Sequence, residues 1–199
     1  MVVAFAVGGR VCGTRAAGGT CTWTSVVTAA AFHSAPAGEH WRGISAIFEC
    51  DRLMLKGVPK VLPPALVKAL CEMGHGDTLV LADGNFAAHT VGKNAVVVRV
   101  DGHGSPELLD AILQLVPLDT YVEKPVGRMQ IVPGDPVETP IWDVYDGILA
   151  KYDARGADTI EEIERFAFYE RAKGAYLIIA TGEQALYANL LLQKGVVTD

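Results

Sequence analysis

From residue 57 onward, segments with helical spacing of apolar residues alternate with short, dense apolar runs, and this alternation limits the folds open to the chain. The run TLVLAD (78–83) predicts a buried strand, because a short apolar run between turn-forming residues is typical of strands. NAVVVRVD (94–101) predicts a second one, since β-branched valine favours strands. Helices that alternate with strands across short loops indicate an α/β fold. We therefore expect a single compact domain in which helices pack on a central mixed sheet.

The same pattern gives the expected order of elements along the chain. We expect helices over 64–73, 106–116, 140–152 and 159–173, and strands over 78–83, 94–101, 126–132, 175–182 and 185–192. Ser105 is the expected N-cap of the second helix, with Pro106 at its first position. Thr159 and Glu162 fit a capping box at the start of the fourth helix, and Gly174 is its expected C-terminal stop.

The first 53 residues differ from the rest, because they are rich in glycine, alanine, threonine and serine and keep no helical or strand period. We expect 1–53 to be an extension that is either disordered or a translated upstream segment, in which case Met54 is the older start of the protein. We expect 54–199 to be the folded domain. Two alternatives stay open, an organelle transit peptide and structure packed on the domain. The expected location is cytoplasmic, with organelle targeting by the extension as the alternative.

One histidine stands in an unusual place. EMGHGDTLVLADGNF (72–86) puts His75 between two glycines, directly before the first predicted strand. A histidine can give or take a proton near neutral pH, and flanking glycines let a ligand approach closely. The local sequence alone favours the alternative, a histidine in a surface turn. His103 stands in a second GHG tripeptide, where a strand end, a turn and a helix cap explain it.

Charge and motifs argue against several classes of function. The formal net charge of −6 disfavours nucleic acid and anionic membranes as partners. The apolar runs are strand-sized, below the roughly 18 residues that a membrane-crossing helix needs. Cysteine spacing matches no zinc pattern, and Cys71 is expected to be a reduced thiol. A metal site from Cys71, His75 and Asp77 is conceivable, but the helix should end at Gly74, and HExxH, CxxC and phosphate-binding glycine motifs do not occur.

Polar side chains recur in the last third of the chain at spacings that suit a sugar site. Arg165 and Tyr169 are four residues apart and therefore share one face of the predicted helix. Tyr187 and Asn189 point the same way if 185–192 is a strand. A guanidinium, a phenol and an amide suit a polyhydroxylated ligand. For any single tyrosine, packing in the core with its hydroxyl at the surface is the alternative that the sequence favours.

Three separated stretches together resemble the fucose mutarotases, which share a family with the ribose pyranases. They are KGVPKVLPPALVKALCEMGHGDTLVLADGNFAA, LLDAILQLVPLDTYVEKPV and IERFAFYERAKGAYLIIATGEQALYANLLLQKGVV, and the match covers about residues 55–197. The resemblance implies a cofactor-free α/β fold and a ring-like homo-oligomer with its site near subunit contacts. The implied activity is that of an isomerase, which interconverts the α and β anomers of L-fucose by acid–base ring opening and closure.

The resemblance also implies a role for each residue that matches a family motif. His75 is the implied proton donor, and Asp119 of PLDTY and Tyr169 are its implied catalytic partners. The implied ligands of the sugar are Asp83, Met129, Arg165, Tyr187 and Asn189. Neither a metal ion nor a cofactor is implied. One departure is visible, since Ala87 stands in a turn beside the site where the family usually has proline.

Two other functions stay open beside L-fucose mutarotation. One is the same chemistry on another monosaccharide such as ribose, and the other is a non-catalytic sugar-binding protein. Met129 and Phe86 would form an apolar wall for a 6-deoxy methyl group, which favours fucose. The intact set of His75, Asp119 and Tyr169 favours catalysis. The expected partners are a small sugar and further copies of the chain, without nucleic acid or membrane.

Overall fold

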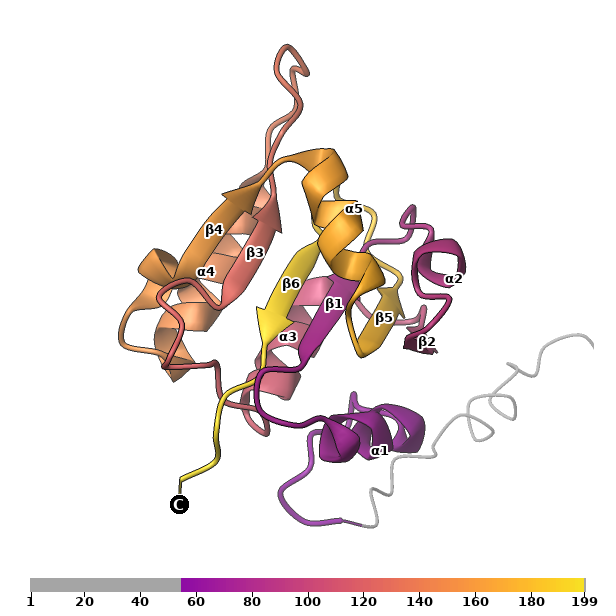
Figure 1. The fold of residues 1–199 in the computed structure, drawn as a ribbon, viewed down its shortest axis with the longest axis vertical. Helices are drawn as coiled ribbons and strands as arrows, with labels where there is room; N and C mark the ends of the chain where they lie inside the picture. The colour runs from indigo at the N-terminus through magenta and orange to yellow at the C-terminus, as the bar shows by residue number, and fades with distance from the viewer. Residues whose placement is uncertain (1–54, 199) are drawn as a thin grey trace, which may run out of the picture. The chain divides into compact units, whose positions relative to one another are not determined.

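The computed structural model describes residues 55–198, and the predicted extension over 1–53 lies outside them. The elements in chain order are α1 (Pro64–Glu72), β1 (Thr78–Ala82), α2 (Ala88–Val91), β2 (Val96–Val100), α3 (Ser105–Leu113), β3 (Val126–Met129), α4 (Pro140–Tyr152), a 3₁₀ turn (Gly156–Thr159), β4 (Ile160–Ile163), α5 (Arg165–Lys173), β5 (Leu177–Thr181) and β6 (Leu190–Gln193). The strands of this described part form one six-stranded sheet in the order β2-β5-β1-β6-β3-β4 (Figure 1).

The sheet is mixed, as predicted. β1 is parallel to β5 and antiparallel to β6, and β6 is also antiparallel to β3. The outer pairs, β2 with β5 and β3 with β4, are parallel. β6, in the middle of the sheet, is therefore antiparallel to both of its neighbours. The carboxyl ends of β1 and β3 and the amino end of β6 consequently lie at the same edge.

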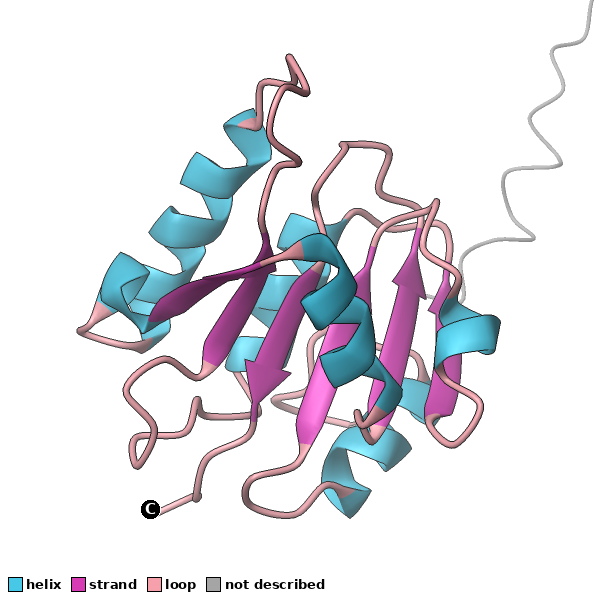
Figure 2. Cartoon of the chain, turned by 45° about the horizontal axis from the view of Figure 1, so that its top comes forward, coloured by secondary structure: helices cyan, strands magenta, loops and turns pink. Residues whose placement is uncertain are grey.

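Helices cover both faces of the sheet (Figure 2). Along β1, Leu79 and Leu81 pack in the core cluster under α1, α3 and α4, whereas Val80 and Ala82 pack in the cluster under α2 and α5. Successive side chains of a strand point to opposite faces, so a strand that is apolar at every position requires cover on both sides. All four side chains are at most 1% exposed, and the predicted α/β fold class is confirmed.

Most predicted elements are present. The helices predicted over 64–73 and 140–152 correspond to α1 and α4, and the strands predicted over 78–83, 94–101 and 175–182 correspond to β1, β2 and β5. The strand predicted over 126–132 is shorter and ends with β3 at Met129. None of the helices within residues 55–198 has the length and apolar character needed to cross a membrane.

The helix predicted over 159–173 is wrong in its first part. Residues Ile160–Ile163 form strand β4, which pairs in parallel with β3. The isoleucines at its two ends pack in the clusters on opposite faces of the sheet, which a strand permits and one face of a helix does not. The helix begins after this strand, and the carboxylate of Glu164 accepts two backbone N–H groups of its first turn. Thr159 and Glu162 therefore form no capping box.

Two other local predictions are wrong. Ser105 is the first residue of α3 rather than its cap, which is Gly104, and its buried hydroxyl lies 3.4 Å from that of Thr181. The strand predicted over 185–192 is shortened to β6, because Tyr187 has a φ of 56°, in the left-handed region that strands do not use. The short helix α2 has no counterpart among the predicted elements.

Candidate active site

A pocket lies at the edge of the sheet where β1 and β3 end and β6 begins. Its volume is about 230 Å³, and its lining residues are Asp83, Asn85, Phe86, Met129, Asp135, Arg165, Tyr169, Leu186, Tyr187 and Asn189. Six of these were assigned a role from the sequence: Asp83, Met129, Arg165, Tyr169, Tyr187 and Asn189. The fold therefore gathers predicted site residues that are as much as 106 positions apart in the chain.

Asp83 and Asn189 form a buried pair at this pocket. The Nδ2 of Asn189 donates to Oδ2 of Asp83 over 2.6 Å, and the backbone N–H of Asp83 donates to Oδ1 of Asn189 over 2.9 Å. Their exposed fractions are 6% and 4%. Burial raises the pKa of Asp83, while hydrogen bonds from Asn85 and Asn189 oppose that rise. The reciprocal bonds hold one carboxylate in a fixed orientation directly after β1.

Tyr187 is held in a left-handed backbone conformation, which costs roughly 1–2 kcal/mol for a residue other than glycine. Two side chains of α4 donate hydrogen bonds to backbone carbonyls of its loop. The Nε1 of Trp142 donates to the carbonyl of Tyr187 over 3.0 Å, and the hydroxyl of Tyr145 donates to the carbonyl of Ala188 over 2.9 Å. The Tyr187 hydroxyl donates to Asp135 over 2.6 Å, and this bond raises the pKa of Tyr187. Such fixed strain is typical of functional sites.

Aromatic and apolar side chains form one wall of the pocket. The rings of Phe86 and Tyr169 stack with centroids 5.3 Å apart and planes inclined by 23°. Met129 adds a buried thioether at the end of β3. Arg165, one helical turn before Tyr169, also lines the pocket, as their four-residue spacing predicts. Ala87, in place of the family's proline, has a φ of −76°, within the range that proline would fix, so the turn keeps its geometry.

His75 lies at the opposite edge of the sheet, just before β1. Its Nε2 is 3.1 Å from Oδ2 of Asp119. The same oxygen accepts Nε2–H of Gln193 over 3.2 Å, and Oδ1 accepts the backbone N–H of Tyr121 over 2.9 Å. The ring of Tyr121 lies 5.6 Å from that of His75. The carboxylate of Asp119 is 2% exposed and the imidazole 47% exposed, so a buried, fixed acceptor orients a reachable ring.

Hydrogen bonds define the turn that carries His75. Gly76 has a φ of 84°, which favours glycine. Its N–H donates to the carbonyl of Lys194 over 2.9 Å, and the N–H of Gly74 donates to the carboxylate of Asp77 over 2.7 Å. The glycines around the histidine therefore belong to a hydrogen-bonded turn, and this turn places the imidazole beside Asp119.

The two groups of predicted site residues are too far apart to contact one sugar within a single chain. Strand β1 separates them with five residues, and at about 3.3 Å per residue its ends lie roughly 16 Å apart. Neither His75 nor Asp119 lines the pocket that contains Tyr169. The chain brings His75 together with Asp119 at one edge, and the other six predicted residues together at the other.

Sequence reasoning missed three residues that line the pocket, Asn85, Asp135 and Leu186. Asp135 belongs to the turn VPGDP between β3 and α4, and this cluster of turn residues after a predicted strand is the signal that marks it. His103 pairs with Glu107 over 3.0 Å in an exposed turn, as predicted. In the described part of the chain no group of three or more His, Cys, Asp or Glu side chains is arranged to hold a metal ion, and Cys71 is free and exposed.

Comparison with known proteins finds one matching family and several relatives named as fucose mutarotases. Residues 56–197 match the RbsD / FucU transport protein family. The fucose mutarotase of Homo sapiens is 51% identical over 147 residues, which are 72% of this chain and 94% of that protein. The solved structure of FucU from Bifidobacterium longum, 66% identical, has a TM-score of 0.71 and covers 72% of this chain and 100% of its own. The fucose mutarotase of Streptococcus pneumoniae in complex with L-fucose, 46% identical, has a TM-score of 0.67 with the same coverage.

Proposed function

Because the chain belongs to the RbsD / FucU transport protein family, we propose that it is an isomerase that interconverts the α and β anomers of L-fucose. The observation that carries the proposal is the pocket after β1, where six predicted residues converge. Their carboxylate, amide, phenol and guanidinium groups are the donors and acceptors that sugar hydroxyls require. The apolar wall of Phe86 and Met129 suits the C–H face of the ring.

The reaction requires proton transfer at two oxygens. An acid protonates the ring oxygen while a base removes the proton of the anomeric hydroxyl, the bond from the anomeric carbon to the ring oxygen breaks, and an open-chain aldehyde forms. The carbonyl carbon then turns, the ring oxygen attacks its other face, and the two protons return. Positioned acid–base groups typically accelerate such steps by about 10²–10⁴-fold.

We assign the proton transfers to His75 and Tyr169. His75 serves as the acid–base group, since its exposed imidazole is oriented by the buried carboxylate of Asp119. Tyr169 presents a hydroxyl at the sugar pocket for the second oxygen. Asp83 and Asn189 hold sugar hydroxyls from a fixed, buried position. Met129, Arg165 and Tyr187 complete the pocket as further contacts of the sugar.

A neighbouring copy of the chain completes the site in this proposal. His75 and Tyr169 cannot reach the same sugar within one chain, because the length of β1 separates them. A ring-like homo-oligomer would bring the histidine of one copy to the pocket of the next. Tyr121 beside His75 is 80% exposed, and Phe166 beside Arg165 is 72% exposed. Large exposed aromatic side chains near His75 and near the pocket support a contact between copies at these two places.

The apolar wall decides the proposed sugar. L-Fucose carries a methyl group where most hexoses carry a hydroxymethyl group, and Phe86 and Met129 offer it apolar surface. A site with apolar surface discriminates a methyl group from a polar one because the polar group would lose hydrogen bonds to water. Ribose has no such methyl group, so we expect weaker activity on it.

Saturation-transfer NMR on L-fucose and D-ribose tests the function. We expect the protein to accelerate exchange between the fucose anomers. No acceleration with either sugar would leave a non-catalytic sugar-binding protein, and acceleration with ribose alone would make the chain a pyranase. The variant His75→Ala should abolish exchange while the assembly persists. His103→Ala is the matched control, since it removes the histidine of the other GHG tripeptide and should leave exchange unchanged.

We place this function in residues 54–199 and in the cytoplasm. The family match over 56–197 supports the first statement, because it covers the described domain and excludes the extension. A chain that begins at Met54 should therefore fold and keep its anomer exchange. Loss of exchange in that shorter chain would give 1–53 a part in the domain. Imaging of the full chain in cells distinguishes the cytoplasm from an organelle.

A further inference from the structure

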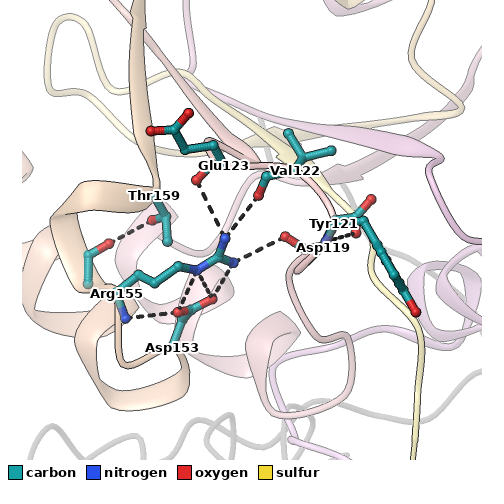
Figure 3. A network of polar contacts seen from close by, with 8 residues as sticks. Asp119, Tyr121, Val122, Glu123, Asp153, Arg155 and Thr159 are labelled. Atoms are coloured by element: carbon teal, nitrogen blue, oxygen red, sulfur yellow. Dashed lines mark hydrogen bonds and ion pairs between the residues drawn. The ribbon is translucent and has the colours of Figure 1, made fainter.

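Arg155 follows α4, and its guanidinium reaches the loop over residues 119–123, which we call the Asp119 loop (Figure 3). On one side it pairs with Asp153, where Nε donates to Oδ1 over 3.0 Å and Nη2 donates to Oδ2 over 2.7 Å. On the other side it donates to the carbonyl of Val122 over 2.9 Å and to that of Asp119 over 3.1 Å. One side chain thus joins the end of α4 to the backbone of this loop.

Arg155 anchors the part of the Asp119 loop that the sheet does not reach. At the start of the loop, the N–H of Asp119 donates to the carbonyl of Gln193, at the end of β6, over 3.1 Å. Farther along, the loop lies at the surface, and Arg155 donates to the carbonyls of Val122 and Glu123. The position of the loop beyond its first residue therefore depends on this guanidinium.

The Asp119 loop carries both groups that contact His75. The carboxylate of Asp119 accepts a hydrogen bond from Nε2 of His75, and the ring of Tyr121 lies against the imidazole. The N–H of Tyr121 also donates to the Asp119 carboxylate, so a displacement of the loop would move this acceptor. The placement of the imidazole therefore depends on the conformation of the loop.

We propose that Arg155 is a positioning residue for the acid–base pair of His75 and Asp119, which it aligns through the Asp119 loop without touching the sugar. This inference rests on the proposed function. Arginine suits the task because its planar guanidinium offers five donors in a fixed fork. Asp153, whose side chain is 13% exposed, orients the fork and raises the pKa of Arg155. Lysine has one compact ammonium group and cannot span Asp153 and the loop carbonyls together.

Kinetics of Arg155→Ala test the proposal. We expect kcat for L-fucose to fall by about ten- to a hundred-fold, since a misplacement of about 1 Å in a catalytic group costs on that order. KM should stay close to that of the wild type, because the pocket residues lie at the opposite edge of the sheet. Added guanidinium ion should restore part of kcat, and Arg155→Lys should lie between alanine and the wild type.

Arg99→Ala is the matched control. Arg99 pairs with Asp101, two residues away, through both Nε and Nη2, as Arg155 pairs with Asp153, and it lies on β2, away from the Asp119 loop. Its loss should leave kcat within about twofold, since exposed ion pairs contribute little. An equal fall of kcat in both variants would overturn the proposal, because it would reflect the loss of any ion pair.

Amide hydrogen exchange of Tyr121 gives a second test that needs no sugar. Its N–H donates to Asp119, so we expect faster exchange in Arg155→Ala and in Arg155→Lys, but not in Arg99→Ala. If the alanine variant does not fold, the lysine variant decides. Wild-type Tyr121 exchange and wild-type kcat in a folded Arg155 variant would overturn the proposal. A wild-type protein without activity on L-fucose would contradict the proposed function, whereas Tyr121 exchange would still report on Arg155.

Discussion

The Nε2 of His75 lies 3.1 Å from the carboxylate of Asp119, and this pair occupies the edge of the sheet opposite to the pocket of Asp83 and Asn189. β1 and β6, which lie side by side and run in opposite directions, connect the two edges. Each end of these two strands therefore carries half of the proposed chemistry. In the proposed reaction, a sugar in the pocket of one chain would need an acid–base group from a different chain.

Mixed assemblies test this division of the site between chains. His75→Ala removes the proposed acid–base group from one half of the site, and Tyr169→Phe removes the proposed catalytic hydroxyl from the other half, so each variant alone should be inactive. If two copies form each site, random mixing of the variants should restore up to roughly a quarter of the sites. Saturation-transfer NMR on co-expressed variants measures the recovered exchange. No recovery in assemblies that mass spectrometry shows to contain both variants would place all catalytic groups in one chain.

The raised pKa of Asp83 predicts a specific pH dependence of stability. Burial raises it above the ordinary value of 3.8, so the folded state binds this proton more tightly than the unfolded chain. The stabilising contribution is complete below about pH 3.8 and is lost as the pH rises through the folded-state pKa. Relative to Asp83→Asn, which does not titrate, the wild type should therefore gain free energy of unfolding as the pH falls. Urea unfolding over a series of pH values measures the difference.

Asp110 provides a control of opposite sign for this titration. Its carboxylate accepts a hydrogen bond from Lys151, which lowers the pKa of Asp110. A lowered pKa gives a contribution that is present above the unfolded-state value and is lost as the pH falls through the folded-state value. The difference between the wild type and Asp110→Asn should shrink toward acid pH. The same slope in both comparisons would contradict the cause assigned to Asp83.

The sequence predicted those parts of the fold in which local pattern and tertiary packing agree. The run 78–83 is apolar from Leu79 to Ala82 and became β1, and the pattern over 140–152 became α4. The pattern failed at 160–163, where residues compatible with a helix pair with β3 instead. Glu164 then caps α5. Pairing between distant strands decides such a segment, and a single sequence does not contain that information.

The candidate site was also predicted where local spacing determines it and missed where contacts between distant segments determine it. Spacing alone placed Arg165 and Tyr169 on one helix face, and the structure places both at the pocket. The separation of His75 from Tyr169 by the length of β1 depends on strand order and direction, which no local pattern specifies. Arg155 was missed for the same reason, because its contacts with the Asp119 loop are more than 30 positions away in the chain.

Trp142 supports the strained backbone at Tyr187, and its removal should weaken sugar binding. In Trp142→Phe the ring still packs beneath the guanidinium of Arg128, which lies 4.0 Å from the tryptophan ring, but the donor to the Tyr187 carbonyl is lost. The left-handed conformation is then less populated, so KM for L-fucose should rise by about ten-fold, equivalent to roughly 1.4 kcal/mol. Steady-state anomer exchange at varied fucose concentration measures KM. An unchanged KM would show that Tyr187 keeps its conformation without the indole.

Tyr145 supports the neighbouring carbonyl, and its hydroxyl should matter for stability far more than that of Tyr152. The side chain of Tyr145 is fully buried, and its hydroxyl donates to the carbonyl of Ala188 over 2.9 Å. Tyr145→Phe leaves this buried acceptor without its partner, which should lower the free energy of unfolding by about 1–3 kcal/mol. In Tyr152→Phe the lost bond is an exposed one to Asp110, and water replaces it, so the change should be small. Urea unfolding of both variants measures the contrast. Equal losses would mean that the Ala188 carbonyl finds another donor, and the loop before β6 would then not depend on α4 for its conformation.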